Sequence, residues 1–155
     1  DTAEFAVAAI KRWWTKLGKK RYQSGKRLLV TADSGGSNSP RTRLWRWELQ
    51  RLANATGLKI ELCHYPPGTS KWNKIEHRLF CHITRNWQGI PLEDLEIVIN
   101  LIGSTTTEEG LEVHAWLDRH QYEKSRKITD DQLQEVRIKR NEFHGEWNYE
   151  ILPAK

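Results

Sequence analysis

A strand, helix, strand pattern between residues 28 and 65 constrains the fold of this chain more than any other feature. The runs "LLVTAD" (28–33) and "LKIELCHY" (58–65) are apolar and of strand length, and "RTRLWRWELQRLANATG" (41–57) has helical periodicity and a stop at Gly57. A crossover of this length joins parallel strands. The pattern therefore predicts a parallel pair, and the nearly unbroken apolar run 28–33 predicts a strand covered on both faces.

The rest of the chain predicts further helices around this unit. Asp1 is the expected N-cap of the first helix, Ser39 that of the crossover helix with Pro40 at its first position, and Ser70 can cap a third. The expected elements are a helix over 3–17, a basic loop over 18–27, helices over 70–87, 91–103 and 129–136, a strand or extended arm over 111–119, and an irregular tail over 142–153.

Composition restricts the class of protein. A chain of 155 residues with 37% hydrophobic content fits one compact domain, and most of its eight Trp are expected in the core. Its net charge of +5 favours a polyanionic partner weakly. Two separate cysteines predict a reduced, cytoplasmic setting, and no apolar run reaches the roughly 18 residues of a membrane span. The absence of Met suggests that sequence upstream has been removed.

Two carboxylates are candidates for a common site. Asp33 ends the first strand and His64 the second, at the edge where parallel sheets bind ligands. Glu76 lies within an apolar helical stripe formed by Trp72, Ile75, Leu79, Phe80 and Ile83, with no Lys or Arg one turn away. Converging carboxylates repel each other unless one is protonated or a cation lies between them. Mg²⁺ prefers such oxygen ligands and could support phosphodiester cleavage.

Other interpretations of these residues stay open. Asp33 could cap the following turn, and Glu76 could pair with a distant Arg. Another possibility is a zinc site formed by Cys63, His64, His77 and Cys81. Cys63 and His64 should, however, point to opposite faces of a strand. The turn "DSGGSN" could hold a phosphate at a helix N-terminus, but it matches neither the Walker nor the dinucleotide-binding spacing.

Long segments around these carboxylates resemble the DDE transposases of bacterial insertion sequences, most closely the Rhodopirellula-type group. The resemblance runs through "DTAEFAVAAIKRWW", "LLVTADSGGSN", "RLWRWELQRLANATGLKIELCHYPPGTSKWNKIEHRLFCHITRNW" and "EFHGEWNY". "PPGTSKWNKIE" also has the pattern of the Asn-x-Ile-Glu segment of mariner-like transposases.

The resemblance implies an α/β fold of the RNase H-like (retroviral-integrase-like) type. It implies a partial catalytic domain over 1–104, truncated at its N-terminal strands, and a helical or irregular C-terminal extension of the same domain over 105–155. Asp33 matches the second catalytic carboxylate and Glu76 the third, and these would help to hold two Mg²⁺ or Mn²⁺ ions. The first carboxylate would precede the first helix, so the chain could also be an inactive DNA-binding or assembly fragment.

The resemblance further implies cleavage at transposon ends and strand transfer into target DNA. Expected partners are double-stranded DNA and further copies of the chain, with no membrane, in a bacterial cytoplasm and on the nucleoid when DNA is bound. Candidates for supporting the carboxylates are Asn38, His64 and Asn73. Candidates for phosphate contacts are Lys71, Lys74, Arg41, Arg43 and the run 19–21.

Overall fold

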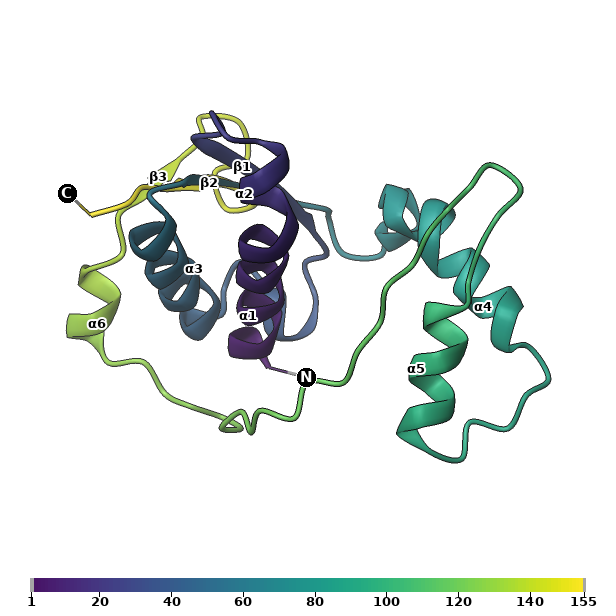
Figure 1. Cartoon of the computed structure of the whole chain (residues 1–155). Coiled ribbons are helices and arrows are strands. Elements are labelled where there is room, and N and C mark those ends of the chain that lie inside the picture. The colour runs from purple at the N-terminus through teal and green to yellow at the C-terminus, as the bar shows by residue number, and fades with distance from the viewer. Residues whose placement is uncertain (1, 155) are drawn as a thin grey trace. The chain divides into compact units, whose positions relative to one another are not determined.

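The computed structural model describes residues 2–154 and divides the chain into two compact units (Figure 1). Unit 1 comprises residues 1–70 and 122–155, and unit 2 comprises residues 71–121. Unit 2 is therefore inserted in the sequence of unit 1.

Unit 1 contains a mixed four-stranded sheet in the order β1-β2-β4-β3. β1 and β2 are parallel, with Arg27 opposite Lys59 and Ala32 opposite His64. β4 runs antiparallel to both β2 and β3. The strands are β1 (Arg27–Ala32), β2 (Lys59–His64), β3 (Ile138–Arg140) and β4 (Asn148–Ile151). The predicted parallel pair is confirmed.

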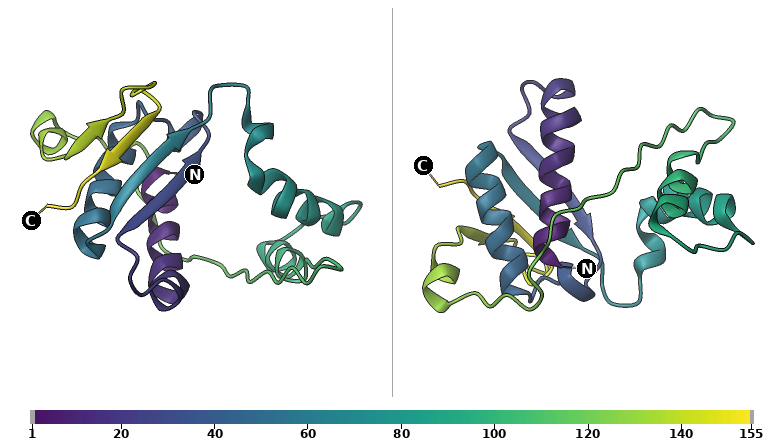
Figure 2. Two further views of the ribbon diagram at one scale, coloured as in Figure 1. Left: turned by 90° about the horizontal axis from the view of Figure 1, so that it is seen from above. Right: turned by 60° about the horizontal axis from the view of Figure 1, so that its bottom comes forward.

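Helices α1 (Ala3–Trp13) and α3 (Arg43–Thr56) pack together on one face of this sheet (Figures 1 and 2). Within the described part of unit 1, no helix lies on the other face, which looks toward the viewer in the left view of Figure 2. Leu29 in β1 is 59% exposed, so the prediction that both faces are covered is wrong. Exposure alternates along β1, as expected for a sheet with one open face.

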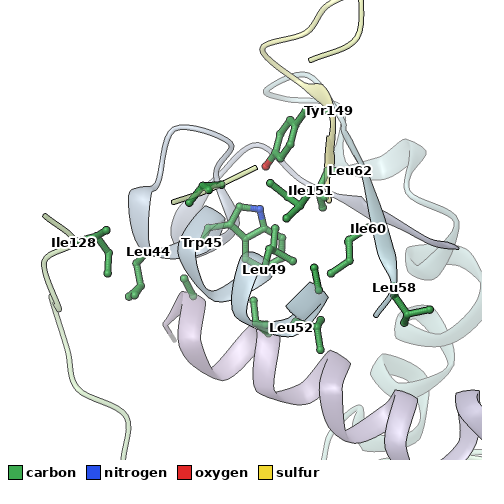
Figure 3. Packing of buried hydrophobic residues seen from close by; sticks show 14 of the residues in the cluster. Leu44, Trp45, Leu49, Leu52, Leu58, Ile60, Leu62, Ile128, Tyr149 and Ile151 are labelled. Carbon is green, nitrogen blue, oxygen red and sulfur yellow. The ribbon is translucent and has the colours of Figure 1, made fainter. Parts of the chain in front are cut away.

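The hydrophobic core lies between the sheet and the two helices (Figure 3). Trp45, Leu49 and Leu52 from α3 meet alternate residues of β2 and β4. Leu49, Ile60 and Ile151 have no exposed surface, and Trp45 is 1% exposed. The 3.6-residue period of α3 and the two-residue period of the strands thus supply complementary apolar faces.

The N-terminal helix is longer than predicted. α1 continues into a π-helical turn η1 (Trp14–Gly18) and then α2 (Lys19–Arg21), so the beginning of the expected basic loop is helical. The predicted cap, Asp1, lies outside the described residues. Thr2 occupies the N-cap position, and its hydroxyl accepts a hydrogen bond of 3.1 Å from the backbone N–H of Phe5.

The crossover helix α3 begins after Thr42 rather than after Ser39. The Ser39 hydroxyl accepts from the backbone N–H of Arg41 over 3.3 Å, so it stabilises the preceding turn and the predicted helix cap is wrong. That turn follows a short 3₁₀ helix, η2 (Gly36–Asn38). The predicted end of α3 is confirmed, because Gly57 has a left-handed φ of 71°.

The C-terminal region returns to unit 1. The short helix α6 (Asp130–Gln134) forms within the predicted range 129–136 and begins with a capping box between Thr129 and Gln132. The expectation of an irregular tail over 142–153 is wrong, because β4 lies there between β2 and β3.

Unit 2 contains short helices. Asp94 caps α5 through a 2.8 Å bond from the Ile97 N–H, so this helix starts later than predicted. No strand forms over 111–119 in the described chain. The helical elements are η3 (Ser70–Trp72), which begins at the boundary with unit 1, the π-helical η4 (Glu76–Phe80), α4 (Cys81–Trp87) and α5 (Leu95–Gly103). Ser70 is predicted to cap the helix over 70–87, but its side chain is not among those that the structure describes.

The predicted apolar stripe around Glu76 does not form a buried face. Ile83 is buried, but Trp72, Ile75 and Phe80 are 61%, 38% and 44% exposed. The helix is interrupted after Trp72, and η4 has π-helical hydrogen bonding from i to i+5. The 3.6-residue period behind the prediction therefore does not hold in this segment.

Candidate active site

Asp33 is the first residue after β1, at the carboxyl end of the parallel pair. Its Oδ1 atom is fully buried and has no hydrogen-bond partner among the described residues. Burial of a carboxylate oxygen without a donor costs on the order of 1–3 kcal/mol or more. A divalent cation with oxygen ligands would satisfy this atom, so the environment of Asp33 fits a metal ligand.

His64, at the end of β2, supports the backbone beside this carboxylate. Its Nδ1 lies 3.2 Å from the backbone carbonyl oxygen of Asp33, and its Nε2 lies 3.0 Å from the hydroxyl of Tyr149. A carbonyl oxygen only accepts, so Nδ1 donates and Nε2 accepts from the phenol. The predicted supporting role of His64 thus takes the form of a contact with the main chain of Asp33, which leaves the side chain free.

Burial favours the neutral forms of both His64 and Tyr149. Burial lowers the pKa of His64, partly opposed by its bond to Asp33. Burial also raises the pKa of Tyr149 to about 12. The Trp45 indole nitrogen faces the Tyr149 hydroxyl in Figure 3, although it has no hydrogen-bond partner of normal geometry in the described chain. The phenol is thus held between His64 and the core.

Sequence reasoning missed two residues beside this site. Tyr149 comes from β4, and the signal for it was the alternation in "NYEI". Arg46, in α3, interacts electrostatically with Tyr149, and burial lowers the pKa of its guanidinium. Its Nε is buried without a partner among the described residues.

The turn after Asp33 is tied to the end of β2. The hydroxyl of Ser34 donates to the backbone carbonyl of Tyr65, whose own N–H donates to Ala32 over 2.8 Å. Asn38, a predicted supporting residue, lies in η2, where its Oδ1 accepts from the Ser37 hydroxyl over 3.0 Å. Asn38 therefore organises its own turn in this structure.

Glu76, the other predicted carboxylate, begins η4 in unit 2. Its side chain is half-buried and forms no hydrogen bond or ion pair with the described residues of that unit. Its backbone N–H donates to the carbonyl of Asn73 over 3.0 Å, so Asn73 supports the start of the helix. Asp33 and Glu76 belong to different units, and their sharing of an ion stays a prediction.

The predicted phosphate contacts have different environments. Lys71, Lys74 and Arg41 are exposed, and the carbonyl of Lys71 also bonds to a ring nitrogen of His77 over 2.7 Å. Arg43 forms an ion pair with Asp130 and is therefore less available for a phosphate. The run 19–21 is exposed along α2.

The alternative zinc site receives no support from these contacts. Both ring nitrogens of His64 are hydrogen-bonded, and the thiol of Cys81 donates to the carbonyl of His77 over 3.1 Å. Between residues 2 and 154, no group of three or more His, Cys, Asp or Glu side chains could hold a metal ion. A complete ligand set is therefore not assembled within this part of the chain.

Comparison with known proteins identifies the family. The model of the Rhodopirellula transposase DDE domain matches residues 1–153. No curated protein and no solved structure matches the sequence. Among the helices of the described residues, none is long and apolar enough to span a membrane. The family match covers nearly all of the sequence, and the chain belongs to the Rhodopirellula-type DDE transposase family.

Proposed function

We propose that this chain acts in DNA transposition as a metal-dependent catalytic domain with an RNase H-like fold. Its reactions would be phosphodiester hydrolysis at transposon ends and transfer of the freed 3′ ends into target DNA. Family membership over residues 1–153 supports a role in transposition. The observation that carries the catalytic part is the buried Oδ1 of Asp33, which has no donor in the described chain.

Asp33 and Glu76 are the proposed metal ligands. His64 holds the backbone carbonyl of Asp33, so the carboxylate is positioned without using its own oxygens. Glu76 has no competing partner in the described part of unit 2. A bound Mg²⁺ or Mn²⁺ would polarise a phosphoryl oxygen and lower the pKa of a bound water. The proposal requires the two carboxylates to approach each other in the active state.

The DNA backbone would be held by exposed cations. Lys71 and Lys74 precede Glu76 in the sequence, and Arg41 follows the turn after Asp33. Contacts of this kind position the strand but do not read its sequence. Each phosphate neutralised by such a side chain should steepen the salt dependence of binding.

Metal binding tests the ligand assignment directly. Mn²⁺ binding, followed by electron paramagnetic resonance, should weaken at least about tenfold in Asp33→Asn and in Glu76→Gln, because each variant loses a charged ligand. Glu93→Gln, which changes an exposed acid in unit 2, is the matched control. Unchanged affinity in both ligand variants would contradict the proposal.

Cleavage of DNA that carries the ends of the encoding element tests the activity. We expect Mg²⁺-dependent nicking by the wild-type protein and a loss of at least about a thousandfold in either variant, as for removal of a group that stabilises the transition state. Binding of these ends without cleavage at any Mg²⁺ or Mn²⁺ concentration would instead favour the alternative, an inactive DNA-binding or assembly fragment.

A further inference from the structure

We propose that a hollow at the end of the N-terminal helix binds an unpaired nucleobase of a DNA strand. The hollow has a volume of about 520 Å³ and lies where α1 passes through η1 into α2. Its lining includes the aromatic rings of Trp13 and Tyr22 and the cationic side chains of Lys20 and Arg21. The inference relies on the proposed function only in taking DNA as the partner.

The two aromatic rings of the hollow are available to a ligand. Trp13 is 41% exposed and Tyr22 is 52% exposed, whereas the adjacent Trp14 is 8% exposed and belongs to the core. One of two consecutive indoles thus anchors the helix, and the other borders the hollow. An exposed indole or phenol offers a flat face on which a base can stack.

Gly18 fixes the position of the exposed indole. A Cβ atom at Gly18 would lie 3.1 Å from two ring carbons of Trp13 and 2.5 Å from a ring carbon of Trp14. The absence of a side chain therefore lets both indoles pack closely against the backbone of η1. Single π-helical turns such as η1 occur frequently at functional sites. Trp13 is thereby partly ordered before any ligand binds, which lowers the entropic cost of stacking.

The charge around the hollow complements a phosphate backbone. The segment from Lys11 to Arg27 contains eight Lys and Arg and no Asp or Glu, although the net charge of the whole chain is only +5. The remainder of the chain is therefore net acidic. Lys19, Lys20 and Arg21 are exposed, and none of them forms an ion pair with a residue of the described range 2–154.

The combination of rings and cations favours a nucleic acid strand over other ligands. A purely electrostatic phosphate surface does not need exposed aromatic rings, and an apolar peptide does not need this density of cations. Single-stranded DNA offers both a stacking face and a backbone charge next to it. Bases in an intact duplex are already stacked, so the hollow should prefer a strand with unpaired nucleotides.

Binding of labelled oligonucleotides in EDTA tests this site without metal chemistry. Fluorescence anisotropy would compare a fluorescein-labelled mixed-sequence single strand with a blunt duplex of the same length. Trp13→Ala and Tyr22→Ala should each weaken single-strand binding at least about fivefold and change duplex binding by less than about twofold. Trp13→Phe should restore much of the affinity, because it keeps a stacking ring.

Charge variants separate stacking from electrostatics. Lys20→Gln should lower the slope of log affinity against log salt by about 0.7 for the single strand, whereas Trp13→Ala should leave the slope unchanged. The matched controls are Phe143→Ala, which removes a ring that is 73% exposed elsewhere in unit 1, and Lys124→Gln, which removes an exposed cation. Neither control should change single-strand affinity by more than about twofold.

Wild-type single-strand affinity in both aromatic variants would overturn the proposal, as would an equal loss in Phe143→Ala. Circular dichroism of Trp13→Phe and Tyr22→Phe guards against unfolding, and loss of binding in these folded, ring-containing variants would also contradict stacking. Binding is measured in EDTA, so the result for Trp13→Ala and Tyr22→Ala does not depend on metal ligation by Asp33. Normal cleavage by Asp33→Asn would refute the catalytic assignment and leave the stacking site standing.

Discussion

The Nδ1–H of His64 donates a hydrogen bond to the backbone carbonyl of Asp33 over 3.2 Å, which joins the ends of the two parallel strands. Tyr149 from β4 holds the other ring nitrogen of His64. The position of Asp33 therefore depends on three neighbouring strands. Neither oxygen of its carboxylate takes part in these hydrogen bonds. Second-layer contacts of this kind commonly fix metal ligands, which is the role proposed for Asp33.

Asp33→Asn should not destabilise the metal-free protein. The side chain is half-buried and only its Oδ1 is buried without a donor, so replacing the carboxylate by a neutral amide should change the free energy of unfolding in EDTA by no more than about 1 kcal/mol. Urea unfolding followed by circular dichroism measures this change. Glu123→Gln, at an exposed position, should change stability by less than about 0.5 kcal/mol.

The same variant should lose the stabilisation that a metal ion gives. At a Mn²⁺ concentration a hundred times its dissociation constant, the wild type should gain about 2.7 kcal/mol and Asp33→Asn much less. Equal stabilisation of the two proteins, measured by thermal unfolding, would argue against Asp33 as a ligand.

Tyr149→Phe should change how stability depends on pH in alkaline solution. The pKa of Tyr149 is 10.0 in an unfolded chain and about 12 in the fold. The unfolded state therefore releases this proton first, and the stability that the tyrosine contributes is complete below pH 10 and is lost as pH rises toward 12. The loss amounts to about 2 to 3 kcal/mol.

The phenylalanine variant lacks this alkaline loss. It should be less stable than the wild type near pH 7 by about 1 kcal/mol, because the hydrogen bond to His64 is gone. The difference should shrink or reverse between pH 10 and pH 12. Parallel urea titrations at several pH values provide the measurement, and parallel curves over that window would disprove the assignment.

Leu49→Ala should be among the more damaging substitutions in unit 1. Leu49 has no exposed surface and lies in the core cluster, so a loss of about 2 to 5 kcal/mol is expected from transfer and cavity effects. Leu29→Ala, on the open face of the sheet, changes the same chemical groups at a site that is 59% exposed. It should cost less than about 1 kcal/mol by chemical denaturation.

Gly57→Ala should destabilise the end of α3. Gly57 has a φ of 71°, and an L-residue in this left-handed region costs about 1 to 2 kcal/mol. Gly35→Ala is the matched control, because its φ is −99° and a Cβ there meets no atom within 4 Å. Thermal unfolding should show a lower midpoint for Gly57→Ala alone.

Local patterns predicted the parallel part of unit 1 well. β1, α3 and β2 follow each other closely and each has a clear period, so their existence, order and pairing followed from the sequence. The placement of Asp33 and His64 at one sheet edge followed from the same reasoning and is confirmed. The one-sided burial of β1 was missed, because an apolar run does not reveal how many layers cover it.

Long-range pairing could not be predicted in the same way. β4 is only four residues long, and its pairing with β2 joins segments separated by all of unit 2. Tyr149 was missed as a neighbour of His64 for this reason. In unit 2, the π-helical turn at Glu76 broke the period on which the apolar stripe depended.

The insertion of β4 between β2 and β3 also determines when unit 1 can complete its fold during synthesis. The ribosome makes β1, α3 and β2 early, yet the strand that pairs with β2 and buries Tyr149 and Ile151 comes after all of unit 2. Until Ile151 has emerged, the edge of β2 is unpaired and open to association with other chains. The hydrogen bond between Tyr149 and His64 is therefore assembled last, so a prematurely terminated chain would lack it.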